Sequence, residues 1–101
     1  MKYNKLVRDK IPEIINHRGK ISVTHIADDG EYWEKLKNKL KEETDEFLEE
    51  DNRQELSDIF EVLYAICEFK GINRDKLELI RKKKQEEKGG FKNKIILDEV
   101  N

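Results

Sequence analysis

The sequence lacks the features that mark secreted, membrane-bound or disulfide-stabilised proteins. It has a single cysteine, Cys67, which excludes an internal disulfide and is typical of a small buried residue in a reducing compartment. No apolar run approaches the roughly 20 residues that cross a bilayer, and the first residues lack the apolar stretch of a signal peptide. We therefore expect a cytoplasmic protein with no membrane partner.

An excess of charge of one sign is also lacking. The 21 Lys and Arg residues nearly balance the 23 Asp and Glu residues, for a net charge of -2. Nucleic-acid affinity draws on excess positive charge, so we expect no nucleic-acid partner. With 44% charged and 36% hydrophobic residues in 101, the sequence predicts one domain, residues 1–101, with a thin core. Some helices would then keep uncovered apolar faces, which favours a homodimer or a dimer of dimers.

The hydrophobic pattern predicts a mainly α fold. Apolar residues recur at helical spacing over residues 32–50 and again over residues 54–69. Only Asp51 and Asn52 break the pattern between them, and so short a link requires an antiparallel helical hairpin. We expect two hairpins to pack into a four-helix bundle on oligomerisation.

The flanking segments are shorter and carry clear start and stop signals. Residues 21–26 alternate apolar and polar side chains and are β-branched, which predicts a short extended segment or strand. Residues 91–97 are expected to form an extended tail that buries Ile95, Ile96 and Leu97. The remaining signals are Asp9, Pro12 and Gly19 for an N-terminal helix, Asp29 for the first long helix, and Asn73 and Gly89 for a third, basic helix.

Acidic residues interrupt the apolar faces of both long helices. At about 100° per residue, Glu43 falls inside the first apolar arc and Glu46 at its edge, whereas Glu42 points away. Glu55 and Asp58 lie within the second arc. Ionised carboxylates that face a core are costly unless they are paired or bind a cation. Acidic pairs from adjacent helices could converge on one or two Mg²⁺ ions.

Two structural explanations compete with a metal site. Acidic runs on helices are most often solvated faces, and this chain is rich in acids. Inward carboxylates can also pair with inward basic residues. However, the arcs that carry Glu43, Glu55 and Asp58 contain no obvious basic partner, so the pattern favours a metal site.

The two acidic motifs together resemble the MazG-like all-α nucleoside triphosphate pyrophosphohydrolases, whose hallmark is E-E-x-x-E followed by E-x-x-D. The stretches Tyr3–Pro12 and Gly89–Lys92 are similar to a small branch of that group, the phosphoribosyl-ATP pyrophosphohydrolase-like proteins. One departure is the spacer: only eight residues separate Glu46 from Glu55, fewer than is usual. The matching motif residues are Glu42, Glu43, Glu46, Glu55 and Asp58.

The resemblance implies water attack on the α-phosphorus of a nucleoside triphosphate, giving a monophosphate and pyrophosphate. Removal of non-canonical nucleotides is one role that it suggests. The expected cofactor is Mg²⁺, with Mn²⁺ as an alternative. Glu43, Glu46, Glu55 and Asp58 are the expected metal ligands. The role of Glu42 stays open: it could contact a water molecule, support the metal ligands through a hydrogen bond, or be an exposed side chain.

Phosphate groups need cationic partners, and two sets of residues are candidates. The first set is Lys5, Arg8 and Lys10, and the second is Lys92 and Lys94. Taken one by one, these residues are more often solvated surface side chains than phosphate ligands. Two further functions stay open: a non-catalytic helical module for nucleotide sensing or protein association, and a purely structural hairpin.

Overall fold

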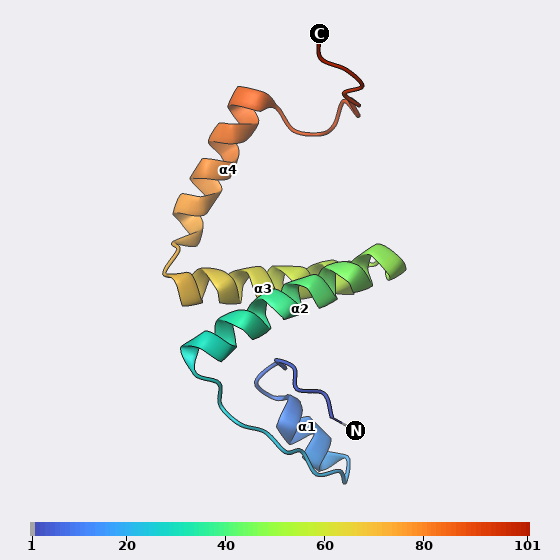
Figure 1. Ribbon diagram of the computed structural model, residues 1–101, viewed down its shortest axis with the longest axis vertical. Helices are drawn as coiled ribbons and strands as arrows, with labels where there is room; N and C mark the ends of the chain where they lie inside the picture. Colours follow the sequence, from blue (N-terminus) through green and yellow to red (C-terminus); the bar gives the residue numbers. More distant parts are fainter. Residues whose placement is uncertain (1) are drawn as a thin grey trace. The chain divides into compact units, whose positions relative to one another are not determined.

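The computed structural model describes residues 2–101 and is mainly α-helical, as predicted (Figure 1). The chain divides into two compact units, Met1–Ile66 and Cys67–Asn101, so the expectation of a single domain stays a prediction. No helix of the described chain is both long and apolar enough to cross a membrane. The helices are α1 (Ile11–His17), α2 (Asp29–Glu50), α3 (Arg53–Lys70) and α4 (Arg74–Lys88).

Helices α2 and α3 form the antiparallel hairpin that the sequence predicted (Figure 1). The Asp28 side chain accepts a hydrogen bond from the Glu31 backbone N–H at the start of α2. Asp51 ends that helix in the left-handed conformation, with φ of 54°. The Asn52 side chain then accepts a hydrogen bond from the Glu55 backbone N–H and caps α3. Two residues therefore end one helix, reverse the chain and begin the next.

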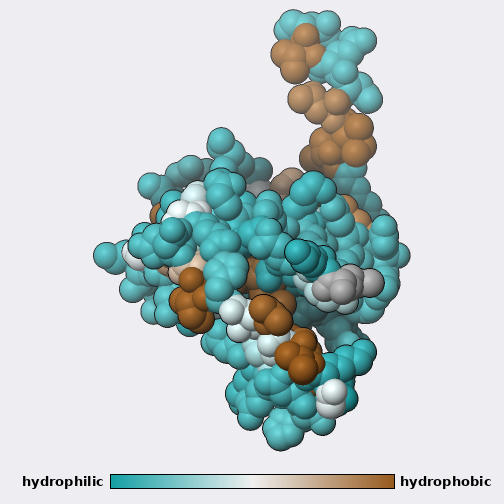
Figure 2. Space-filling view, turned by 60° about the horizontal axis from the view of Figure 1, so that its bottom comes forward, coloured by the Kyte–Doolittle hydropathy of each residue, from teal (hydrophilic) through white to brown (hydrophobic). Residues whose placement is uncertain are grey.

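The core is thin, as the composition indicated. The buried apolar residues are Leu36 in α2 and Val62 and Cys67 in α3. Many large apolar side chains are exposed instead, and Figure 2 shows them as separate patches on a largely hydrophilic face. Those of α3 within the first unit are Leu56, Phe60, Leu63 and Tyr64.

The strand predicted over residues 21–26 is wrong. The described part of the chain contains no strand, and this segment has no regular structure. Ile21, Val23 and Ile26 are each at least 90% exposed. An alternating β-branched pattern fits a half-buried sheet surface, but a strand needs a partner to pair with. No strand exists within residues 2–101 with which residues 21–26 could pair, so this segment stays irregular.

The C-terminal tail is not buried within its own unit, so the predicted burial does not occur there. The tail begins with a tight turn, in which the Lys94 backbone N–H donates to the Phe91 carbonyl at 3.1 Å. Ile95, Ile96 and Leu97 follow without regular structure and are about as exposed as their neighbours. No surface within the second unit therefore covers these apolar side chains.

Two of the predicted helix caps are displaced by one residue. Helix α1 carries Pro12 in its first turn as expected, but its N-cap is Lys10 and not Asp9, and no side chain caps it. Helix α2 is capped by Asp28 and not by Asp29. Asn73 caps α4 and Gly89 ends it, as predicted.

A short irregular stretch before α1, here called the N-terminal segment (residues 4–10), is tied to the hairpin. The Lys35 ammonium of α2 donates to the Asn4 carbonyl at 2.8 Å. Asn4 has φ of 45°, a conformation that asparagine adopts more readily than most residues. Leu6 and Val7 are half-buried. This attachment brings Lys5 and Arg8 to the carboxylates described next.

Candidate metal centre

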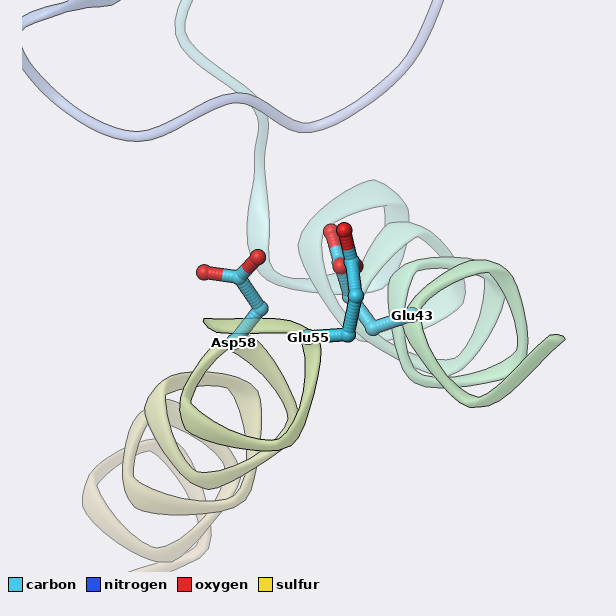
Figure 3. A group of neighbouring side chains, drawn as sticks. All are labelled: Glu43, Glu55 and Asp58. Atoms are coloured by element: carbon cyan, nitrogen blue, oxygen red, sulfur yellow. The ribbon is translucent and has the colours of Figure 1, made fainter. Parts of the chain in front are cut away.

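Three of the five predicted carboxylates meet where α2 and α3 face each other. Glu43 comes from α2, and Glu55 and Asp58 come from the first turns of α3. One oxygen from each carboxylate lies within 4.8 Å of the others. Figure 3 shows the three side chains rising on the same side of the hairpin. The inward orientation that the helical spacing predicted for these residues is confirmed.

The buried apolar residues of the hairpin explain this orientation. Leu36, the most deeply buried large side chain, lies two turns before Glu43 on the same face of α2. Val62 is buried one turn after Asp58 and two turns after Glu55 on α3. Burying Leu36 and Val62 between the helices therefore turns the carboxylates toward each other.

Glu43 is unusually buried for a carboxylate. Its side chain is only 9% exposed, and its Oε1 pairs with the Lys39 ammonium at 3.2 Å. Its Oε2 has no hydrogen-bond partner within residues 2–101, and neither does the buried Oε2 of Glu55. Leaving a buried acceptor unsatisfied costs roughly 1–3 kcal/mol, and more if it is charged. The free lone pairs of these two oxygens fit a bound cation.

The electrostatics of the group also favour an added positive charge. Burial raises the pKa of Glu43; Lys39 opposes this rise, and the charges of Glu46 and Asp58 add to it. Burial likewise raises the pKa of Glu55, with further contributions from Glu46, Glu50 and Asp58. Both carboxyl groups are therefore harder to ionise than ordinary ones. A divalent cation among them would reverse that effect.

The spacing of the oxygens is close to that of a hard-cation site. Two ligands of one Mg²⁺ lie at most about 4.2 Å apart, and two ligands of one Ca²⁺ at most about 5 Å. The separations of up to 4.8 Å between Glu43, Glu55 and Asp58 need only a small side-chain movement to fit the smaller ion. All donors are carboxylate oxygens, which Mg²⁺, Mn²⁺ and Ca²⁺ prefer. The residues present thus fit the expected cofactor.

The sequence reasoning named Arg8 only as a phosphate partner and missed both Lys39 and the pairing of Arg8 with Asp58. Its statement that the acidic arcs lack a basic partner is wrong. Lys39, with a side chain 17% exposed, pairs with both Glu42 and Glu43. Its spacing of four residues from Glu43 is a signal that could have revealed it. The Arg8 guanidinium donates to Asp58 Oδ1 at 2.8 Å. No local pattern connects these two residues, which are 50 positions apart.

The other predicted site residues have different surroundings. Glu42 is half-buried and accepts a hydrogen bond from Lys5 at 3.3 Å, so it is an ion-pair partner outside the group of three. Glu46 is exposed and acts on Glu55 through its charge, and its role as a fourth ligand stays a prediction. Lys10 makes no ion pair within residues 2–101. Lys92 and Lys94 are exposed in the second unit, so their phosphate-binding roles stay predictions.

Comparisons with known proteins add little to this geometry. No family model and no solved structure match the chain. Over 49 residues the chain is 45% identical to an uncharacterized protein of Mycolicibacterium smegmatis. The match covers 48% of this chain and 50% of that protein, so the chain spans about half the length of its relative. Membership of the MazG-like group therefore stays a proposal that depends on the two acidic motifs.

Proposed function

We propose that this protein is a Mg²⁺-dependent nucleotide pyrophosphohydrolase of the MazG-like type. It would hydrolyse a nucleoside triphosphate to a monophosphate and pyrophosphate, with Mn²⁺ as an alternative cofactor. The observation that carries the proposal is the convergence of Glu43, Glu55 and Asp58, together with the nine-tenths buried side chain of Glu43, whose Oε2 has no hydrogen-bond partner within residues 2–101.

The chemistry suits these residues. Hydrolysis at the α-phosphorus forms a bond from water oxygen to phosphorus and breaks the bond to the bridging oxygen, so that pyrophosphate leaves. Phosphoryl chemistry of this kind needs neutralised charge and an aligned nucleophile more than a covalent residue. The ion, when bound, supplies charge neutralisation and orients phosphate oxygens. Glu43, Glu55 and Asp58 would hold it.

The attacking water needs a carboxylate that orients it and accepts its proton. Glu46 is exposed, so water reaches it, and its charge acts on Glu55 beside the proposed ligands. A carboxylate within hydrogen-bond reach of the water is a suitable general base. We therefore propose this role for Glu46 in place of the ligand role that the resemblance implies, so its removal should lower kcat more than it weakens metal binding.

A panel of canonical and modified nucleoside triphosphates tests the proposal. The purified protein is incubated with each nucleotide and Mg²⁺, and pyrophosphate is scored separately from phosphate. Pyrophosphate release that needs both Mg²⁺ and Glu55 is the expected result. Release of neither product across a broad panel would reject the enzymatic function.

One observation favours a second function, that of an association module. Leu56, Phe60, Leu63 and Tyr64 leave much of α3 apolar and exposed in the first unit. A second hairpin could cover this face in a four-helix bundle, giving a homodimer or a dimer of dimers. Such an assembly is compatible with catalysis, but it would be the whole function if the nucleotide panel shows no hydrolysis.

A further inference from the structure

The N-terminal segment holds cations against the carboxylates of the candidate metal centre. Arg8 donates to Asp58, one of the three converging residues, and Lys5 donates to the neighbouring Glu42. The Lys35 contact to the Asn4 carbonyl fixes the segment just before these two side chains. The protein's own basic residues therefore stand where a metal ion would add positive charge.

Of the two cations paired with the converging carboxylates, Arg8 is more easily displaced than Lys39. Its side chain is 53% exposed and Asp58 is 36% exposed, so the pair contributes little free energy. Lys39, by contrast, is largely buried and belongs to α2 itself. A divalent ion that takes an Asp58 oxygen as a ligand competes directly with Arg8. Once displaced, the guanidinium remains next to the ion with all five of its donors available.

We infer that Arg8 is an exchanging cation: it pairs with Asp58 in the metal-free protein, gives up that carboxylate when a divalent ion binds, and then binds a phosphate of the metal-bound nucleotide. The inference rests on the proposed function and adds a regulatory step to it. A guanidinium matches phosphate oxygens with two parallel hydrogen bonds, which makes it well suited to this second partner.

The exchange predicts that removing the Arg8 side chain changes the affinities for the metal and for phosphate in opposite directions. Removing Arg8 eliminates the competitor, so the metal should bind more tightly in the absence of nucleotide. It also removes a phosphate ligand, so phosphate should bind more weakly once the metal is in place. A residue that only supported the fold would weaken both, and a free surface residue would change neither.

The experiment measures Mg²⁺ binding and phosphate binding on the full chain by titration calorimetry at neutral pH. For Arg8→Ala we expect Mg²⁺ affinity to rise about two- to fivefold, the range set by the strength of exposed ion pairs. At saturating Mg²⁺, its affinity for inorganic triphosphate should fall roughly tenfold or more, as expected for a lost charge-assisted contact. The matched control is Arg18→Ala, which removes an exposed arginine of the same unit. Its side chain makes no hydrogen bond or ion pair within residues 2–101, so both affinities should stay at the wild-type values.

Other outcomes separate this inference from the proposed function. If Arg8→Ala binds Mg²⁺ no more tightly than wild type, or binds triphosphate equally well, the exchange is rejected. If Glu55→Gln still loses Mg²⁺ binding in that case, the metal centre stands without it. A wild-type protein that binds no Mg²⁺ would instead reject the proposed function itself.

A measurement on the wild-type protein keeps the inference testable even if Arg8→Ala does not fold. The guanidinium signal of Arg8 is followed by nuclear magnetic resonance during addition of Mg²⁺ and then of inorganic triphosphate. We expect one shift when Mg²⁺ breaks the pair with Asp58 and a second when triphosphate binds. An Arg8 signal that saturating Mg²⁺ leaves unchanged contradicts the exchange.

Discussion

Two charge-rich parts of this protein use their charges in opposite ways. In α4 every residue is exposed, and its ion pairs are local, such as Glu78 with Arg81 and Lys83 with Glu87. Arg81 lowers the pKa of Glu78. In the α2–α3 hairpin, burial raises the pKa of Glu43 and Glu55, and two of their oxygens have no hydrogen-bond partner among the described residues.

The difference shows that acid content does not identify a functional site. Both parts are dense in acidic and basic residues, and α4 carries the longer basic run. What separates them is the position of the acids relative to the apolar face of the helix. An acid on a solvated face is stabilised by a neighbour three or four residues away. The ionised form of an acid beside Leu36 or Val62 costs free energy unless a cation or a hydrogen-bond donor binds it.

The largest effect expected from this comparison is on hydrolysis. Glu55→Gln should lower Mg²⁺-dependent pyrophosphate release roughly a hundredfold or more, because a neutral amide is a poor ligand for a hard cation. Glu78→Gln, the same substitution on α4, should leave the rate unchanged. Steady-state assays under identical conditions provide the measurement. Equal losses in both variants would mean that the hairpin acids have no special role.

Metal-linked stability is the next largest effect. At a Mg²⁺ concentration about 100 times its Kd, binding to the folded state alone adds about 2.7 kcal/mol to the free energy of unfolding. For a chain of this size that raises Tm by roughly 10–20 °C. Thermal unfolding should show this rise in wild type and in Glu78→Gln, but not in Glu55→Gln. A rise that persists in Glu55→Gln would place the ion elsewhere.

Association should depend on the hairpin and not on α4. Phe60 is 51% exposed on α3, where its ring lies 6.2 Å from that of Tyr64. A charge at this position should weaken self-association roughly tenfold or more, as is common for aromatic residues at the centre of an interface. Sedimentation of Phe60→Lys and of Leu79→Lys, a matched change on α4, tests this. A stable 12.1 kDa wild-type monomer would contradict the proposed bundle.

The smallest effect is the pH dependence of the metal-free protein. A carboxyl whose folded pKa exceeds its unfolded value destabilises the fold above that pKa, and the penalty disappears as pH falls through it. The raised pKa values of Glu43 and Glu55 thus predict a free energy of unfolding that increases as pH falls from 7 toward about 5. Glu55→Gln should reduce this increase and leave the metal-free protein at neutral pH as stable as wild type or more so.

Glu78 provides the opposite sign in the same titration. Its lowered pKa means that it stabilises the fold above its unfolded pKa, and that this contribution is lost as pH falls through the lower folded value. Glu78→Gln should therefore not reduce the stability gained between pH 7 and about 5. Urea denaturation at each pH gives both comparisons. A wild-type protein that loses stability steadily over this range would indicate structural ion pairs at Glu43 and Glu55.

Local signals predicted most of the fold. The extent of α3 and the cap at Asn73 were predictable from helical periodicity and from a side chain that bonds a nearby backbone N–H group. The strand over residues 21–26 was predicted by an equally clear local pattern and does not form. Its stability would have depended on a distant partner, which a local pattern does not reveal. Two caps failed by one residue: at α2 the adjacent Asp28 takes the position predicted for Asp29, and at α1 the N-cap is Lys10 and no side chain caps the helix.

The candidate site likewise has a part that local patterns predict and a part that they do not. The facing of Glu43, Glu55 and Asp58 was predictable because each lies at a fixed angle from an apolar residue on its own helix. Lys39 was predictable by the same rule but was overlooked. The pairing of Arg8 with Asp58 was not predictable from local patterns, since it depends on the path of an irregular segment between distant residues.

Direct titration of a divalent ion into the metal-free protein tests the central claim most simply. Binding of Mn²⁺ is followed by calorimetry or by the electron paramagnetic resonance signal of the free ion. Wild type and Glu78→Gln should bind Mn²⁺ with the same affinity. Glu43→Gln and Glu55→Gln should bind it at least roughly tenfold more weakly, because each loses a carboxylate ligand. Equal affinity in all four proteins, or no binding to wild type, would contradict the assignment of a metal centre to this hairpin.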